Sequence, residues 1–143
     1  MGIDVYEWLE RVGRYEEILN AKLAERERLM SLATRITPNM DGMPRAAGGV
    51  SDRVGSAAVK LAALSTDTDE MFERYAKHKQ AVTEALVQLP KNEFGALHRR
   101  YIQHMTWFEV AADMDKSCAQ VFRYHSAGIQ RLQEILQEKT PSN

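Results

Sequence analysis

The chain has 143 residues, 44% of them hydrophobic and 27% charged, so it can form one domain, or a domain with an extension, around a real core. No apolar run approaches the roughly 18 residues that a membrane-spanning helix needs, and the acidic Asp4 and Glu7 make the N-terminus unlike a signal peptide. Cys118 is the only cysteine, which excludes an internal disulfide framework and favours a cytoplasmic location. The net charge of −1 argues against a strongly basic, indiscriminate nucleic-acid binder.

The first predicted element is one long helix from Ile3 to Ile36. Its apolar residues recur at helical spacings, which indicates the one-sided stripe of an amphipathic or coiled-coil helix. The stripe consists of Val5, Leu9, Val12, Leu19, Leu23, Met30 and Ala33. Thr37 ends this helix, because Pro38 disfavours helical geometry at the residue before it.

The second predicted element is another long helix, which follows a loop from Pro38 to Val50 where prolines and glycines are concentrated. We expect Ser51 or Asp52 to cap this helix and the helix to reach Leu89. Its sequence holds a sustained heptad pattern, which is typical of a coiled-coil seam. The two positions of the repeat are filled by Val54, Leu61, Thr68, Tyr75, Val82 and Leu89, and by Ala57, Leu64, Met71, His78 and Ala85.

Two long stripes joined by a loop most simply fold as an antiparallel, coiled-coil-like helical hairpin. We therefore expect a first domain, residues 1–90, that consists of this hairpin with its loop at about residues 37–50. Each stripe needs a partner surface, which the other helix or a second chain can supply, so pairing within the chain and swapping between chains both stay open. We expect the long helices to mediate a homo-oligomer.

Residues 91–143 form the second predicted domain, in which the pattern changes to three shorter helices. These helices are expected at Asn92–His104, Thr106–Met114 and Ser117–Glu138. This part carries seven Lys and Arg against six Asp and Glu. That balance is a weak electrostatic footprint for DNA, so a prediction of DNA binding must rest on pattern rather than on charge.

Two capping boxes mark the starts of the last two helices. Thr106 is followed three residues later by Glu109, and Ser117 by Gln120, an arrangement in which each pair satisfies two free backbone amides. Helix starts eleven residues apart leave room for one short helix and a tight turn, which is the helix-turn-helix frame. Asp115 occupies the turn, because aspartate tolerates left-handed backbone geometry better than most residues. The expected fold class is all-α, with the hairpin followed by this three-helix unit.

The core of the three-helix unit is expected to be small. It would be filled by Val110, Met114 and Val121, with Ala111 as the small side chain where the last two helices cross. The third side is expected to be closed by Leu97, Tyr101 and Ile102.

In that frame the helix beginning at Ser117, itself a predicted DNA contact, lies in the major groove of double-stranded DNA. Gln120 can pair with adenine, Arg123 with guanine or a phosphate, and Phe122 can contact a thymine methyl. Candidate phosphate contacts, which position the helix without reading sequence, are Lys116, Arg99, Arg100, Arg131 and His125. Cys118 and Ala119 also face outward but offer little readout, so we expect modest base specificity; Ala127 is the remaining outward position.

The segment from Thr106 to Leu132 resembles, without gaps, the region-four helix-turn-helix of primary bacterial sigma factors in its T-x-x-E-V-A pattern, its serine cap and the following Val and Leu. The whole chain is similar to a family of small phage and prophage transcriptional regulators with such a module. The motifs that carry this likeness are LATRITP, SDRV, LHRRYI and TWFEVAADM, in that order. The resemblance implies a DNA-binding regulator of phage genes. Because region four also contacts RNA polymerase, it implies as an alternative an adaptor that binds polymerase or another regulator with little DNA contact.

The residues favour no enzymatic function. The four histidines are scattered, none forms H-E-x-x-H, and no second cysteine exists, so we expect neither a metal nor a cofactor. Cys118 would lie at a helix N-terminus, but no fixed base accompanies it. Two further alternatives stay open: a plain three-helix packing unit and, from the phage likeness alone, a DNA-packaging component that forms rings. Trp107 and Phe108 are expected in the core or facing a partner rather than stacking on bases.

Overall fold

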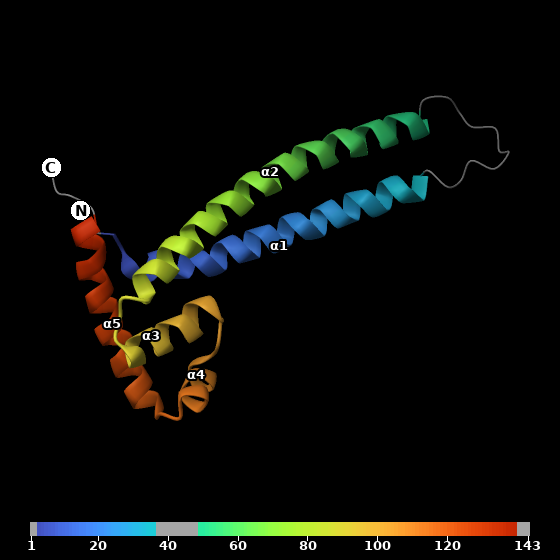
Figure 1. Ribbon diagram of the computed structural model, residues 1–143. Helices are drawn as coiled ribbons and strands as arrows, with labels where there is room; N and C mark the ends of the chain where they lie inside the picture. Colours follow the sequence, from blue (N-terminus) through green and yellow to red (C-terminus); the bar gives the residue numbers. More distant parts are fainter. Residues whose placement is uncertain (1–2, 37–48, 140–143) are drawn as a thin grey trace. The chain divides into compact units, whose positions relative to one another are not determined.

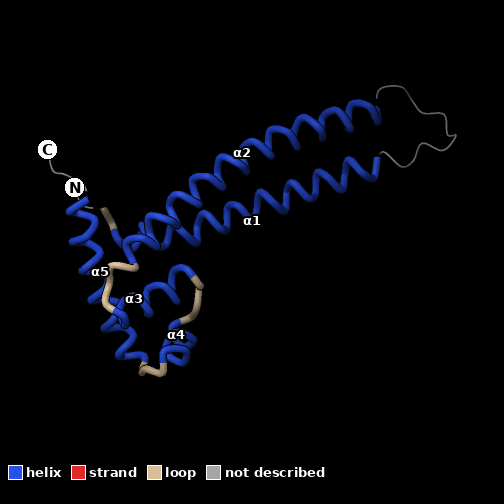
Figure 2. The backbone as a smooth tube through the Cα atoms, viewed as in Figure 1, coloured by secondary structure: helices blue, strands red, loops and turns tan. Residues whose placement is uncertain are grey.

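The computed structural model describes residues 3–36 and 49–139, with the backbone alone for residues 35–36, 49–54 and 139. The elements are α1 (Val5–Ile36), α2 (Gly49–Leu86), α3 (Lys91–Leu97), the π-helical turn η1 (His98–Ile102), α4 (Trp107–Met114) and α5 (Cys118–Lys139) (Figure 1). No strand occurs in the described residues (Figure 2), so the all-α prediction is confirmed. Within this part of the chain, no helix combines the length and the apolar character needed to cross a membrane.

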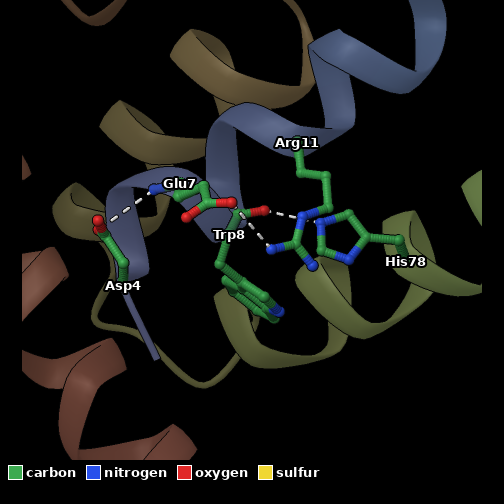
Figure 3. A network of polar contacts seen from close by, with 5 residues as sticks. All are labelled: Asp4, Glu7, Trp8, Arg11 and His78. Atoms are coloured by element: carbon green, nitrogen blue, oxygen red, sulfur yellow. Dashed lines mark hydrogen bonds and ion pairs between the residues drawn. The ribbon is translucent and has the colours of Figure 1, made fainter. Parts of the chain in front are cut away.

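Helix α1 begins where it does because Asp4 caps it. The Asp4 carboxylate accepts a hydrogen bond from the Glu7 backbone N–H at 3.3 Å (Figure 3), and the Asp4 carbonyl accepts one from the Trp8 N–H at 2.9 Å. A carboxylate placed there satisfies one of the amides that a helix start leaves free. Glu7 then reaches one turn along to Arg11 at 3.4 Å, an exposed pair that contributes little stability.

The stripe predicted for α1 is confirmed in its first half. Val5, Leu9, Val12 and Leu19 are all buried. In the second half, Leu23 and Met30 are 47% and 48% exposed and Leu29 is buried instead, so the prediction is wrong at these two positions, whereas the predicted Ala33 is half-buried. A helix that packs against a single neighbouring helix buries only a narrow face, so apolar residues of α1 beside that face remain exposed to solvent.

The start of α2 differs from the prediction. The predicted cap at Ser51 or Asp52 is wrong, because both residues lie inside a helix that begins at Gly49. The loop predicted for Pro38–Val50 lies outside the described residues, apart from its last two, which are helical.

The end of α2 comes three residues before the predicted Leu89. The Gln88 and Leu89 N–H groups bond to carbonyls only three residues back, at 3.2 and 3.0 Å. These tighter bonds close the last turn immediately before Pro90, which cannot continue the helix.

The heptad predicted for α2 is confirmed by burial, because every member whose side chain is described is buried or half-buried. Its two polar members have hydrogen bonds that compensate their burial. The Thr68 hydroxyl donates to the Leu64 carbonyl at 2.7 Å, and His78 Nε2 lies 2.7 Å from the Trp8 carbonyl oxygen (Figure 3).

The third helix, predicted as one α-helix over Asn92–His104, is wrong in its second half. α3 ends at Leu97 and passes into η1, where the Gln103 N–H bonds to the His98 carbonyl five residues back at 3.1 Å. The chain then turns at His104, which has a φ of 58°. A π turn holds more residues than an α turn, so the side chains after it face directions that an uninterrupted α-helix would not give.

The chain forms two compact units, which are described separately. One consists of Met1–Tyr15 and Tyr75–Asn143, and the other of Glu16–Arg74. The predicted domains, residues 1–90 and 91–143, divide the chain differently, and that boundary stays a prediction.

The first unit is built around a main cluster of apolar side chains from α1, α2, α3, η1 and α5. Its buried members are Val5, Trp8, Leu9, Val12, Val82, Ala85, Leu86, Leu89, Leu97, Tyr101, Ile129 and Leu132. Each of these helices therefore buries one apolar face against the others, the usual source of stability for helices in water. In the second unit, α1 and α2 lie side by side (Figure 1) and Lys22 forms an ion pair with Asp67.

Candidate nucleic-acid interface

The start of α4 and the turn that ends it are built by the residues that the sequence pattern predicts. The Thr106 hydroxyl accepts from the Glu109 N–H at 3.2 Å, and the Glu109 carboxylate accepts from the Thr106 N–H at 3.1 Å, which completes the first capping box. The bond from the Thr106 backbone, above all, holds the pKa of Glu109 below its usual value. Asp115 ends α4 with a φ of 56° and a ψ of 48°, the expected left-handed geometry.

Ser117 and Gln120 form the second capping box, at the start of α5. The Gln120 N–H donates to the Ser117 hydroxyl oxygen at 3.2 Å. The Gln120 amide oxygen accepts from the Ser117 N–H at 3.0 Å and from its hydroxyl at 3.3 Å. Both lone pairs of that oxygen are therefore occupied, whereas a bidentate pair with adenine needs the oxygen as well as the nitrogen. In this conformation Gln120 stabilises the helix start, and its contact with adenine stays a prediction.

A small cluster holds α3, α4 and α5 together. Its buried members are Ala96, Val110, Ala111 and Val121, and its half-buried members are Met105, Trp107, Met114, Cys118 and Tyr124. The core predicted from Val110, Ala111, Met114 and Val121 is confirmed. The outward placement predicted for Cys118 is wrong, because its side chain packs against this cluster.

The predicted third side of the small cluster is wrong. Leu97 and Tyr101 are buried in the main cluster and Ile102 packs against it, while Ala96 contacts the small cluster. Neighbouring residues of a helix point about 100° apart, so α3 serves both clusters with successive side chains.

The exposed face at the head of α5 carries Ala119, Phe122 and Arg123, with Lys116 in the preceding turn. The Phe122 side chain is 48% exposed. Among the described residues, the Lys116 and Arg123 side chains have no hydrogen-bond or ion-pair partner. Two cations beside the positive end of the α5 dipole favour an anionic partner here.

Arg99 and Arg131, predicted phosphate contacts, are paired with carboxylates of their own unit. Arg99 Nε lies 2.5 Å from Asp113 Oδ2. Arg131 Nε donates to Glu93 Oε1 at 3.2 Å and lies 2.9 Å from Oε2, which as a buried atom receives no hydrogen bond. Because Glu93 is only 8% exposed, removing Arg131 from it would leave a buried charge unpaired, which is strongly unfavourable.

Arg100, the third predicted phosphate contact among the arginines, is half-buried and held in place by two neighbours. Its guanidinium lies 4.7 Å from the centre of the Trp107 ring, a cation–π contact, and its Nη1 donates to the Met105 carbonyl at 3.0 Å. No carboxylate of the described residues pairs with it.

His125 was predicted as a phosphate contact, and this is wrong because the side chain is only 8% exposed. Its Nε2 lies 2.7 Å from the Tyr101 hydroxyl oxygen, and the Trp107 ring meets it edge-on at 5.0 Å. Burial first, and the charge of Arg100 second, lower the pKa of His125. Burial likewise raises the pKa of Tyr101 to about 12. The pair is therefore neutral near pH 7.

Trp107 and Phe108 are placed differently from one another. Trp107 is half-buried and meets the Phe122 ring at 5.2 Å. Phe108 is 80% exposed, more than any other large apolar side chain among the described residues. The sequence contains the signal for this, because Phe108 lies two residues before the buried Val110 and so on the opposite side of α4.

The described residues contain no group of three His, Cys, Asp or Glu side chains that could hold a metal ion. No family model matches the chain, and neither a curated protein nor a solved structure matches it.

Proposed function

We propose that the chain is a DNA-binding transcriptional regulator in which α4, the turn at Asp115 and α5 act as a helix-turn-helix. In this proposal α5 enters the major groove with its N-terminal end toward the bases. The observation that carries the proposal is the exposed head of α5, where Lys116 and Arg123 lie without partners among the described residues. The likeness to phage and prophage regulators supports the same function.

The rigidity of this region supports the proposal. Two complete capping boxes fix where α4 and α5 begin, and the left-handed Asp115 fixes where α4 ends. The small cluster, with Ala96 and Ala111 as its small members, lets the three helices approach closely. A reading helix that is already ordered loses less conformational entropy on binding.

We also propose that α1 and α2 form a long antiparallel hairpin that serves for oligomerisation or spacing. Two contacts support it: Trp8 contacts His78 in one unit, and Lys22 contacts Asp67 in the other. Residues later in α1 therefore contact residues earlier in α2, which is the antiparallel order. The exposed Leu23 and Met30 support a homo-oligomer through these helices. Light scattering, which measures the molar mass in solution, tests this proposal. The mass of a dimer would support the regulator, and the mass of a monomer would contradict a homo-oligomer. A much larger mass, that of a ring, would favour a packaging component.

Fluorescence anisotropy with duplexes drawn from genes neighbouring the protein's own tests DNA binding. Arg123→Ala should weaken binding by about 1–3 kcal/mol if Arg123 pairs with a base. The matched control is Arg26→Ala, because Arg26 is also exposed but belongs to the other compact unit. Equal affinity of parent and Arg123→Ala at every salt concentration would remove Arg123 from this role, and no binding to any duplex would contradict the proposal.

A second candidate function, an adaptor for RNA polymerase or another regulator, is favoured by Phe108. An isolated phenyl ring that is 80% exposed on α4 is typical of a side chain that fills a partner's pocket, and a net charge of −1 suits a protein partner better than DNA. Capture of purified RNA polymerase tests it. Phe108→Ser should abolish capture, while Val59→Ser, which removes a 70% exposed side chain in the other unit, should not. Equal capture by both variants would contradict the role of Phe108.

A further inference from the structure

A pocket of about 480 Å³ opens within the first compact unit, between α1, η1, the start of α4 and α5. The α1 wall consists of residues at helical spacing, among them Tyr6, Glu10 and Gly13, so one face of the helix lines it. This volume lies within the range of roughly 300–1,000 Å³ that is usual for small-molecule sites. The pocket is therefore large enough for a small organic ligand.

Aromatic rings form much of the pocket wall. Tyr6, Tyr101 and Trp107 surround the His125 ring with centroid distances of 5.6, 5.7 and 5.0 Å. His125 is in turn fixed by its contact with the Tyr101 hydroxyl. Such rings offer flat, rigid surfaces, and another flat ring gains from stacking or edge contacts with them.

Arg100 supplies the only guanidinium or ammonium group among the lining residues. The Trp107 ring and the Met105 carbonyl hold it in place, yet no carboxylate of the described residues forms an ion pair with it. A half-buried cation without an anionic partner is unfavourable, and a fixed guanidinium can bind a carboxylate through two parallel hydrogen bonds. The group most suited to this position is a ligand carboxylate.

Glu10 limits the charge that the pocket accepts. It lines the α1 wall, is exposed, and has no partner among the described residues. Burial first, and the negative charge of Glu10 second, raise the pKa of the Tyr101 hydroxyl, so this charge acts inside the pocket. A second negative charge on a ligand would therefore be repelled.

We propose that this pocket binds a small aromatic monocarboxylate, with its carboxylate on the Arg100 guanidinium and its ring against Tyr6 and Trp107. The aromatic walls select a flat apolar body, the single cation selects an anion, and Glu10 excludes a dianion. The proposal stands apart from DNA binding, because it uses none of the exposed residues at the head of α5.

Titration of the full chain with benzoate and with uncharged benzamide, followed by calorimetry and by NMR, tests the proposal. Benzoate should bind saturably and shift the Trp107 indole N–H resonance, which the Trp107→Phe variant distinguishes from that of Trp8. Benzamide, which has the same shape but no charge, should bind roughly tenfold or more weakly. Equal binding of the two, or no saturable benzoate binding below about 10 mM, would overturn the proposal.

Two pocket variants and one control extend the test. Arg100→Gln should weaken benzoate binding by roughly tenfold or more, whereas Arg123→Gln, the same change on an exposed arginine outside the pocket, should leave it unchanged. Glu10→Gln should tighten benzoate binding severalfold, because it removes a repelling charge; misfolding could not produce this gain. Unchanged affinity in both Arg100→Gln and Glu10→Gln would overturn the proposal.

Discussion

A methyl group added at Gly128 tests how closely α3 and α5 pack. A Cβ at this position would lie 2.6 Å from Leu97 Cδ1, 3.4 Å from Leu97 Cγ and 3.5 Å from Glu93 Cβ. The first distance is shorter than real Cβ contacts, so something must move. Leu97 is fully buried and therefore cannot turn its side chain into solvent.

The expected size of the effect follows from two opposing contributions. Overfilling a packed core destabilises by about 1–3 kcal/mol, and the short distance to Leu97 places Gly128→Ala in the upper part of that range. Alanine in place of glycine inside a helix stabilises by up to about 1 kcal/mol. We therefore expect Gly128→Ala to lower the free energy of unfolding by about 1–2 kcal/mol.

Urea unfolding followed by far-UV circular dichroism measures this change. The control is Gly13→Ala in the same compact unit, where the added Cβ would lie 3.5 Å from His104 Cε1, an ordinary contact. It should stabilise by about 0.5–1 kcal/mol. Leu97→Ala should make Gly128→Ala less harmful, because it removes the clashing methyl group. A Gly128→Ala protein as stable as the parent would refute the close packing of α3 on α5.

Three further predictions concern stability measured in the same way. Burial above all lowers the pKa values of His78, His98 and His125, so the unfolded chain takes up these protons first and stability should fall as the pH drops below about 6.5; equal free energies at about pH 7.5 and about pH 5.5 would contradict this. Asp115→Gly should stabilise by about 0.5–1 kcal/mol, because glycine adopts the left-handed φ of 56° without strain; a destabilised variant would contradict it. Thr106→Ala should cost about 1 kcal/mol and Thr106→Ser much less, because only the former removes the capping oxygen; equal losses would contradict the cap.

The features predicted correctly from the sequence depend on residues close together in the chain. The capping box of Thr106 and Glu109 requires two side chains three residues apart, and the left-handed turn at Asp115 requires one tolerant residue. The heptad of α2 repeats every seven residues, so its buried line can be read without knowing its partner. Local physical chemistry determines each of these.

The features that the sequence did not reveal depend on residues distant in the chain. His125 lies four residues after the buried Val121 and seven before the buried Leu132, so α5 alone already places it on the buried face. The sequence does not reveal that Tyr6 and Trp107, from two other helices, surround its ring. Nothing in the sequence near Arg131 indicates that it forms an ion pair with Glu93, 38 residues earlier. The π turn of η1 leaves no periodic pattern of apolar residues in the sequence, although it determines where Tyr101 and Arg100 lie.

The partners of the arginines also change what DNA binding should look like. The sequence offers five Lys and Arg candidates, but Arg99 and Arg131 pair with carboxylates and Arg100 lines the pocket. Each neutralised phosphate adds about 0.9 to the slope of log affinity against log salt concentration. Binding through Lys116 and Arg123 alone therefore predicts a slope of about −2, whereas all five contacts would give about −4.5. Lys116→Ala should reduce the steepness by about 1. A parent slope near −4.5 would mean that the three arginines exchange their partners for phosphates, and it would refute the two-cation interface argued from their contacts.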